Sequence, residues 1–411
     1  MTSLRVVAFV LAALPAAAAT CGELAKLALP ATKIATAEAV PAGSFTPPVG
    51  AAIPNLPAFC RVAGSLQPSS DSDIQFEVWL PVSGWNGKLE GLGNGGYAGS
   101  IPYAQLALSI RAGYAAAASD TGHKAGGTDA SWALGHPEKI ADFGHRAVHE
   151  TADKAKALVK AFYGNAQKRA YFNSCSNGGR EALMEAQRYP GDYDGIIAGA
   201  PANYWTHLLT TAIFEVQALA EPGGWIPPAK LPAIQAAALA ACDASDGVKD
   251  SVIDSPDRCK FDPATLLCQG AESDACLTAP QVATLKKLYA GPSIFPGRVP
   301  GAETGPGGWG TWITGMQPGN SLGYAFGTNF FKNMVYNDAA WDYHTFQLQR
   351  DMKVADDKFE RVLNATDPDL KKFHDRGGKL IIYHGWNDPA ISALNNIDYY
   401  KSVTAKMGAK Q

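Results

Sequence analysis

The sequence lacks the two features that would direct a protein to nucleic acid or into a membrane. Its net charge is only −3 over 411 residues, so it carries no basic footprint for nucleic acid or for an acidic lipid surface. Beyond the first 20 residues it has no apolar run of about 20 residues, the length needed to span a bilayer. An apolar content of 46% is ordinary for a folded globular chain. We therefore expect no nucleic-acid partner and no membrane anchor after processing.

The first 20 residues have the pattern of a cleaved export signal. Arg5 supplies positive charge, residues 6–14 form a short apolar run, and residues 16–19 are small alanines that a signal peptidase accepts. This pattern predicts a secreted or periplasmic protein with a mature chain beginning near Cys21. An alanine-rich N-terminus without a targeting role is the alternative.

Export makes the seven cysteines candidates for disulfides. Closeness in sequence suggests two pairs in the second half of the chain, and a third pair would tie the mature N-terminus to the body. A loop of the size of 242–259 would contribute about 3 kcal/mol in the chain-entropy account. Cys175 is most simply the unpaired cysteine. The expected pairs are Cys21–Cys60, Cys242–Cys259 and Cys268–Cys276.

Strands alternate with helices on both sides of an irregular middle segment. The patterns predict helices at 145–163 and 178–188 and strands at 75–81, 88–92, 113–119, 168–173, 193–200 and 377–385. This alternation predicts an α/β fold with a mainly parallel sheet covered on both faces. It stops after Trp205, where a segment rich in alanine, proline, glycine and tryptophan begins. We expect a core built from 21–204 and 366–411, interrupted by an inserted domain at 205–365.

Ser176 stands at the apex of a predicted strand–turn–helix in the sequence YFNSCSNGGRE, residues 171–181. That arrangement is typical of a nucleophile elbow, which raises a hydroxyl clear of the sheet. The N–H of Asn177 at the helix start would face a developing oxyanion, and the glycine loop at 93–99 would supply a second donor through Gly95 or Gly96. Ser174 replaces the first glycine of the G-x-S-x-G pattern, so the motif is degenerate. An ordinary helix N-cap is the alternative for Ser176.

Asp388 follows the predicted strand that ends near Gly385, within the sequence HGWNDP at 384–389. In the Ser, Asp, His order of an α/β-hydrolase triad, this is the place of the carboxylate that orients the histidine. A turn aspartate before a proline is the alternative.

A short acidic loop at 243–254 offers ligands for a hard cation. Asp243, Asp246 and Asp250 surround Gly247, and the backbone carbonyls of Val248 and Val252 would bring the shell toward the six or more oxygens that Ca²⁺ prefers. The spacing is not that of an EF-hand. We expect a structural Ca²⁺ here, with a solvated acidic turn as the alternative.

Taken together, these motifs resemble the tannase and feruloyl esterase family, which are secreted serine esterases. The resemblance covers nearly all of the mature chain and rests on WNGK at 85–88, GNGG at 93–96, CSNGGRE at 175–181, the acidic loop and HGWNDP at 384–389. It implies an α/β-hydrolase fold with a lid at about 205–365 and hydrolysis of an aromatic or phenolic ester through an acyl-enzyme. The roles it implies are Ser176 as nucleophile, Asp388 as triad acid, Gly95 and Asn177 as oxyanion hole, and Asp243, Asp246, Val248, Asp250 and Val252 as calcium ligands.

The aromatic content of the predicted lid suits a cover for a planar ring, although the same residues would also serve as lid core. These residues are Trp309, Trp312, Phe326, Phe330, Phe331 and Trp341.

The sequence departs from the family pattern at the catalytic histidine. In the family this histidine follows the triad aspartate and adjoins a cysteine that pairs with the one before the serine. Here all eight histidines precede Asp388, and Cys175 is the odd cysteine. One hypothesis is an esterase whose sequence here lacks a C-terminal segment, so that the chain as given should be badly impaired in catalysis. The other is a catalytically inactive, calcium-stabilised secreted binding protein. His384, although near Asp388, is expected to be a packed or hydrogen-bonded residue, and His123 a wall residue of the site.

Overall fold

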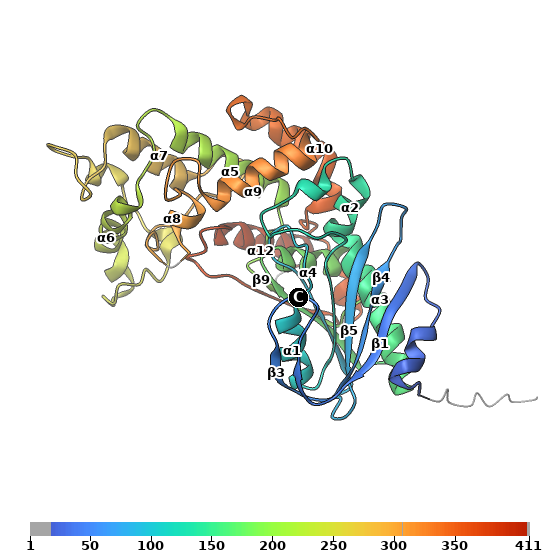
Figure 1. Ribbon diagram of the computed structural model, residues 1–411. Coiled ribbons are helices and arrows are strands. Elements are labelled where there is room, and N and C mark those ends of the chain that lie inside the picture. The colour runs from blue at the N-terminus through green and yellow to red at the C-terminus, as the bar shows by residue number, and fades with distance from the viewer. Residues whose placement is uncertain (1–17, 306, 409–411) are drawn as a thin grey trace, which may run out of the picture.

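The computed structural model describes residues 18–305 and 307–408, and the predicted export signal lies almost entirely outside the described residues. A sheet of eight strands organises the chain, in the order β1-β4-β5-β7-β6-β8-β9-β10 (Figure 1). A separate pair, β2 (Gly43–Phe45) and β3 (Ile53–Leu56), forms a small second sheet. The strands of the main sheet are β1 (Thr32–Val40), β4 (Phe59–Leu66), β5 (Ile74–Pro81), β6 (Lys88–Leu92), β7 (Ala115–Ser119), β8 (Arg169–Cys175), β9 (Gly195–Gly199) and β10 (Lys379–Tyr383).

The sheet has an antiparallel half and a parallel half. β1, β4, β5 and β7 pair antiparallel, whereas β7, β6, β8, β9 and β10 pair parallel. Because parallel strands end at the same edge, the loops after β6, β8 and β10 meet there. The expected α/β-hydrolase core with a mainly parallel sheet is confirmed, while β1 and β4 were not predicted.

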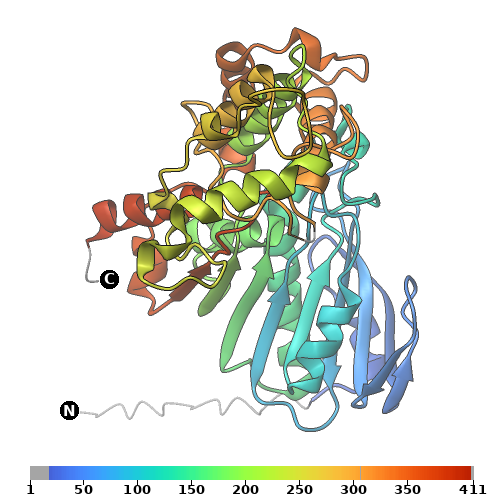
Figure 2. The same cartoon turned by 90° about the vertical axis from the view of Figure 1, so that its left-hand side faces the viewer.

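Helices cover both faces of the sheet (Figure 2). On one face, α3 (Ala147–Tyr163) and α4 (Asn177–Arg188) bury apolar side chains against the strands. On the other face, α1 (Tyr103–Arg111) packs near Trp79. The predicted spacing of α3 is confirmed, and the helix ends at Gly164, whose φ of 71° suits glycine. The last helix, α12 (Ala393–Met407), packs through Tyr399 on the same cluster as α3 and α4.

Residues 205–365, the inserted segment, leave the core after β9 and return before β10, two strands that are parallel neighbours. The segment is helical and lies at one end of the sheet (Figure 1). One apolar cluster lies wholly within the segment and a second is shared with the core, so the segment is more than a loop. Its main helices are α5 (Trp205–Ala220), α6 (Leu231–Cys242), α7 (Ala279–Ala290), α8 (Trp309–Trp312), α9 (Leu322–Asn329) and α10 (Leu348–Leu363).

The three predicted disulfides form, and Cys175 at the end of β8 is unpaired and exposed. Cys21–Cys60 fastens the start of the described chain to β4, and the other two bridges brace the inserted segment. Within residues 18–305 and 307–408, no helix has the length and apolarity required to cross a bilayer.

Candidate active site

Ser176 sits on a strained turn between β8 and α4, with φ 65° and ψ −124°. A residue other than glycine is rarely found with a positive φ, and it persists only where its surroundings fix it. The Ser176 N–H donates to Gly199 O at 2.9 Å, and its carbonyl accepts from the N–H groups of Arg180 and Ala202, both at 3.1 Å. The Ser176 hydroxyl makes no capping bond to the helix, so the geometry is that of an elbow rather than an ordinary N-cap.

The elbow needs small residues around it because the helix start lies very close to β8. A Cβ on Gly178 would lie 1.9 Å from Ser174 Oγ, and a Cβ on Gly93 would lie 2.3 Å from Glu181 Oε2. The departure from glycine at position 174 is therefore accommodated by Gly178. The same contacts bring the loop after β6 against the elbow.

Glu181 connects the two sides of the predicted oxyanion hole. Its Oε2 accepts the backbone N–H of Asn94 at 3.0 Å, and its Oε1 accepts the side-chain amide of Asn177 at 2.9 Å. Glu181 is 1% exposed, and burial raises its pKa to about 7 against the opposing charge of Arg180. This buried carboxylate holds the glycine loop beside the helix whose first N–H groups lack intrahelical partners.

Arg180 fixes the start of α4 to backbone carbonyls of neighbouring segments. Its Nε donates to Asn177 Oδ1 at 2.8 Å, and its Nη atoms donate to the carbonyls of Phe143, Gly144 and Leu363. Arg180 is fully buried, and burial lowers its pKa to about 10, so it stays charged at neutral pH. The Asn177 side chain is thus held between a cation and a carboxylate.

Asp388, the predicted triad acid, is firmly placed after β10. Its Oδ1 accepts the N–H groups of Ala390 at 2.8 Å and Ile391 at 3.0 Å, and its Oδ2 lies 3.0 Å from His384 Nε2. Burial alone would raise the pKa of Asp388, but these hydrogen bonds outweigh it and hold the pKa below the usual value. Asn396 contacts the other ring nitrogen of His384. His384 is therefore a hydrogen-bonded residue, as predicted, and it positions Asp388.

Each of the eight histidines has a polar partner other than Ser176. His123 bonds to Tyr97 O at 2.7 Å and stacks on Trp132, and burial lowers its pKa to about 4. It does not belong to the set of described residues lining the cavity beside Ser176, so its expected role as a wall residue is wrong. The partners of the other histidines are His136–Asp71, His145–Tyr189, His149–Asp192, His207–Asp356, His344–Asp342, His374–Asp375 and His384–Asp388.

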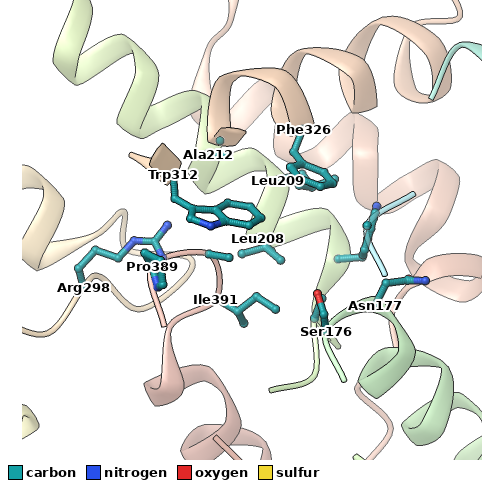
Figure 3. A pocket seen from close by; sticks show the side chains of 15 residues that line it. Ser176, Asn177, Leu208, Leu209, Ala212, Arg298, Trp312, Phe326, Pro389 and Ile391 are labelled. Carbon is teal, nitrogen blue, oxygen red and sulfur yellow. The ribbon is translucent and has the colours of Figure 1, made fainter. Parts of the chain in front are cut away.

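Ser176 opens into a cavity of about 200 Å³ whose walls come from both the core and the inserted segment (Figure 3). Gly96 and Asn177 line it beside the serine, whereas Gly95 is exposed next to them. The rings of Trp312 and Phe326 form a second wall, stacked with centroids 5.6 Å apart. The remaining walls are mostly aliphatic, from Ala202, Leu208, Leu209, Ala212, Pro389, Ala390 and Ile391.

Two of the six predicted lid aromatics therefore line the cavity, and four are core of the inserted segment. Trp309, Phe330, Phe331 and Trp341 are at most 8% exposed and pack within apolar clusters. Tyr97, in the glycine loop, stacks on Phe326 and donates its hydroxyl to Phe326 O at 2.7 Å. This contact joins the glycine loop to the aromatic wall of the cavity.

Comparison with known proteins agrees with this geometry. A family model described as tannase and feruloyl esterase matches residues 60–411. The chain belongs to the tannase and feruloyl esterase family. It is 46% identical to an uncharacterised esterase of Xanthomonas campestris pv. campestris, over 99% of this chain and 74% of the relative. It is 33% identical to a probable feruloyl esterase B-1 of Aspergillus terreus, over 85% of this chain and 66% of the relative.

The solved structure of feruloyl esterase B from Aspergillus oryzae superposes with a TM-score of 0.87 at 29% identity, covering 94% of this chain and 78% of that one. The tannase and feruloyl esterase fold therefore extends over nearly the whole described chain. The chain spans about two thirds of the length of the Aspergillus terreus relative.

The acidic loop keeps its three aspartates close to backbone donors. Asp243 is 5% exposed and accepts the N–H groups of Asp250 and Ser251, while Asp246 and Asp250 each accept an N–H two residues on. The all-oxygen donor set suits a hard cation. Across the described part of the chain, however, no three acidic, cysteine or histidine side chains converge enough to hold a metal, so these carboxylates would have to turn inward on binding.

Two residues that shape the site were not predicted from the sequence. Glu181 lies four positions after Asn177 on α4, a spacing that puts both on one helix face, and this signal was available. Arg298 lines the cavity from an irregular stretch between α7 and α8, where no periodicity marks it.

Proposed function

We propose that this protein is a secreted or periplasmic serine carboxylic ester hydrolase that acts on aromatic or phenolic esters through an acyl-enzyme on Ser176. The observation that carries the proposal is the Ser176 hydroxyl, raised on a strained elbow at the mouth of an apolar cavity with stacked aromatic walls. The names of the relatives, esterase and feruloyl esterase, support the same reaction class.

In the proposed reaction Ser176 Oγ bonds to the ester carbonyl carbon while its proton passes to a base. The oxygen that becomes negative is held by the backbone N–H of Asn177 and by an N–H of the glycine loop, at Gly95 or the neighbouring Gly96. The bond between the carbonyl carbon and the alcohol oxygen then breaks, and the alcohol takes up the proton. Water, activated by the same base, next attacks the acyl-enzyme and releases the acid and Ser176. Asp388 is the carboxylate that would orient a histidine base.

A second candidate is a calcium-stabilised binding protein of the same fold without catalysis. It is favoured by one observation, the engagement of all eight histidines with partners other than Ser176. Such a protein would keep the cavity and its aromatic wall but not the proton transfer.

Hydrolysis of methyl ferulate, methyl gallate and a terephthalate monoester by the purified protein tests the esterase proposal, with Ser176→Ala as control. Because all eight histidines have partners other than Ser176, we expect only slow hydrolysis of at least one ester, and its loss in Ser176→Ala. Binding of these esters without turnover, unchanged in Ser176→Ala, would support the binding protein instead. If none is bound or hydrolysed, the aromatic-ester proposal is wrong.

A further inference from the structure

Arg298 closes the end of the cavity opposite the nucleophile. Figure 3 places its guanidinium beyond Trp312 and Pro389, with Leu208 and Ile391 between it and Ser176. The cavity therefore has a reactive polar end, an apolar middle and a second polar end.

The Arg298 guanidinium is buried and already neutralised. Its side chain is 8% exposed, Nε donates to Glu215 Oε1 at 2.8 Å, and Nη2 donates to Glu215 Oε2 at 2.9 Å. Burial opposes the charge, but Glu215 outweighs it and raises the pKa of Arg298, so the guanidinium stays charged. Glu215 belongs to α5, so the pair joins that helix to the irregular stretch before α8.

The remaining nitrogen, Nη1, is buried without a hydrogen-bond partner. A buried donor left unpaired is costly, and such a group in a binding cavity points to a ligand or a water that accepts from it. The charge of Asp388 also helps to raise the pKa of Arg298, but Asp388 makes no hydrogen bond to Nη1. Nη1 is thus a free donor on a side chain that lines the far end of an otherwise apolar cavity.

We propose that Arg298 Nη1 donates a hydrogen bond to a neutral oxygen substituent, a phenolic hydroxyl or a methoxy group, on the ring of the bound ester, at the end of the ring away from the ester carbonyl. This inference rests on the proposed function. Because Glu215 already balances the guanidinium, a neutral acceptor fits better than a second carboxylate, which would leave the buried group with a net negative charge. Arg298 is then a specificity-determining residue that favours oxygenated rings over plain ones.

The test compares two ligands that differ by one oxygen, methyl 4-hydroxycinnamate and methyl cinnamate. Affinities are measured by calorimetry in a Ser176→Ala background, where neither ester turns over. The hydroxylated ester should bind about two- to tenfold more tightly, the range expected for one hydrogen bond. The double variant Arg298→Met with Glu215→Leu should bind the two esters with equal affinity.

The double variant avoids leaving Glu215 as a buried, unpaired charge, which the single change would do. Arg298→Lys in the same background is the second variant, because it keeps the charge but removes the guanidinium fork, and it too should lose the preference. Each variant is its own control, since the ratio of two ligands cancels any general loosening of the fold.

Preference for the hydroxylated ester that survives in both variants would overturn the role of Arg298. Equal affinities in the Ser176→Ala parent would also overturn it, with Nη1 then satisfied by water, and would leave the esterase proposal intact. If neither ester binds the parent, it is the proposed aromatic site that fails.

Discussion

Glu181 Oε2 accepts the backbone N–H of Asn94 at 3.0 Å, across 87 positions of sequence, within a completely buried contact. Its other oxygen accepts from Asn177, so one carboxylate fixes the distance between the glycine loop and the elbow helix. The Asn94 N–H and the Asn177 side-chain amide are both donors, so each needs a Glu181 oxygen that accepts a hydrogen bond.

Glu181→Gln should therefore lower kcat by about tenfold or more while leaving KM nearly unchanged. The amide would oppose one donor with another and shift an oxyanion donor, and removal of such a donor typically costs about 10²–10³ in rate. Steady-state kinetics on the best ester from the screen above gives the measurement. Glu185→Gln is the matched control, since Glu185 is equally buried, one turn further along α4 and outside the hole.

Equal losses in the two variants, or a loss confined to KM, would mean that Glu181 serves only the general stability of α4. The melting temperature of each variant distinguishes that case from a specific effect on the site.

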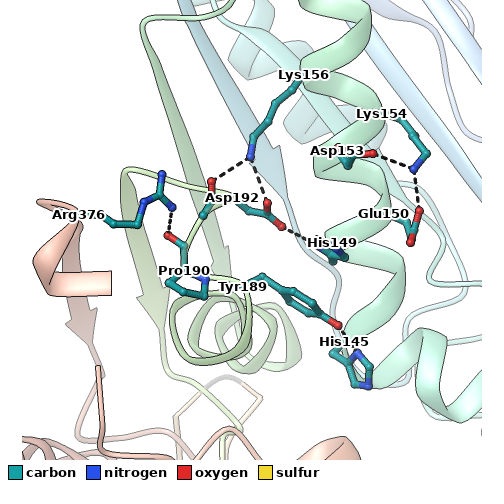
Figure 4. A network of polar contacts seen from close by, with 11 residues as sticks. His145, His149, Glu150, Asp153, Lys154, Lys156, Tyr189, Pro190, Asp192 and Arg376 are labelled. Carbon is teal, nitrogen blue, oxygen red and sulfur yellow. Dashed lines mark hydrogen bonds and ion pairs between the residues drawn. The ribbon is translucent and has the colours of Figure 1, made fainter. Parts of the chain in front are cut away.

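The raised pKa of Glu185 should make the free energy of unfolding depend on pH. Burial, reinforced by the nearby charge of Asp192, raises its pKa well above the usual value, and Lys156 offsets this only in part. Asp192 is fixed in turn by His149 and Lys156 (Figure 4). Between the unfolded and folded pKa values the native state binds a proton that the unfolded chain lacks, so stability falls as pH rises through this range.

Glu185→Gln should remove that contribution, because its amide carries no charge at any pH. Its free energy of unfolding should exceed that of the wild type at pH 8 and approach it at pH 5, as measured by urea titration at both values. A difference that is independent of pH would contradict the raised pKa of Glu185.

The acidic loop predicts a Ca²⁺ contribution to stability. We propose that Asp243, Asp246 and Asp250, with the carbonyls of Val248 and Val252, bind a structural Ca²⁺. EDTA should then lower the melting temperature by about 3 °C or more, and added Ca²⁺ should restore it. Asp243→Asn should lose this response, while Asp257→Asn, at an exposed aspartate beyond the loop, should keep it. A melting temperature indifferent to EDTA would count against the metal.

Cys175 should be the one cysteine that reacts in the native protein. It is exposed and unpaired, while the other six cysteines form disulfides. Partial burial and the charge of Asp388 raise the pKa of its thiol, so the reaction with a disulfide reagent should be slow at pH 7 and faster near pH 9. One thiol per chain is expected without denaturant, and none in Cys175→Ser.

The elbow and the disulfide pairs could be predicted because few residue types fit at those positions. A side chain at Gly178 or Gly179 would clash with its neighbours, so the small residues of the elbow leave a recognisable pattern in the sequence. The cysteine spacings likewise predicted the disulfide pairs. Strand β4 was missed because Arg61, Gly64 and Ser65 interrupt its apolar pattern, although it pairs antiparallel with β1 and β5, which are close to it in sequence.

The division of the lid aromatics and the role of Arg298 were beyond the sequence, for a different reason. Trp312 lines the cavity, whereas Trp309 packs in an apolar cluster. This difference depends on how the helices of the inserted segment pack together, which the sequence does not predict. The proposed role of Arg298 depends on its hydrogen bonds to Glu215 and on the lack of a partner for its Nη1, and neither can be predicted from the sequence.

The two ends of the inserted segment lie against each other, because the Ala365 N–H donates to Asn203 O at 2.8 Å. Its attachment points are therefore close together, so the segment can lengthen, shorten or be replaced with little effect on the sheet. The proposed reacting groups belong to the sheet edge, whereas Trp312, Phe326 and Arg298 belong to the inserted segment. Such an arrangement would allow the choice of substrate to change without altering the residues proposed to cleave the ester.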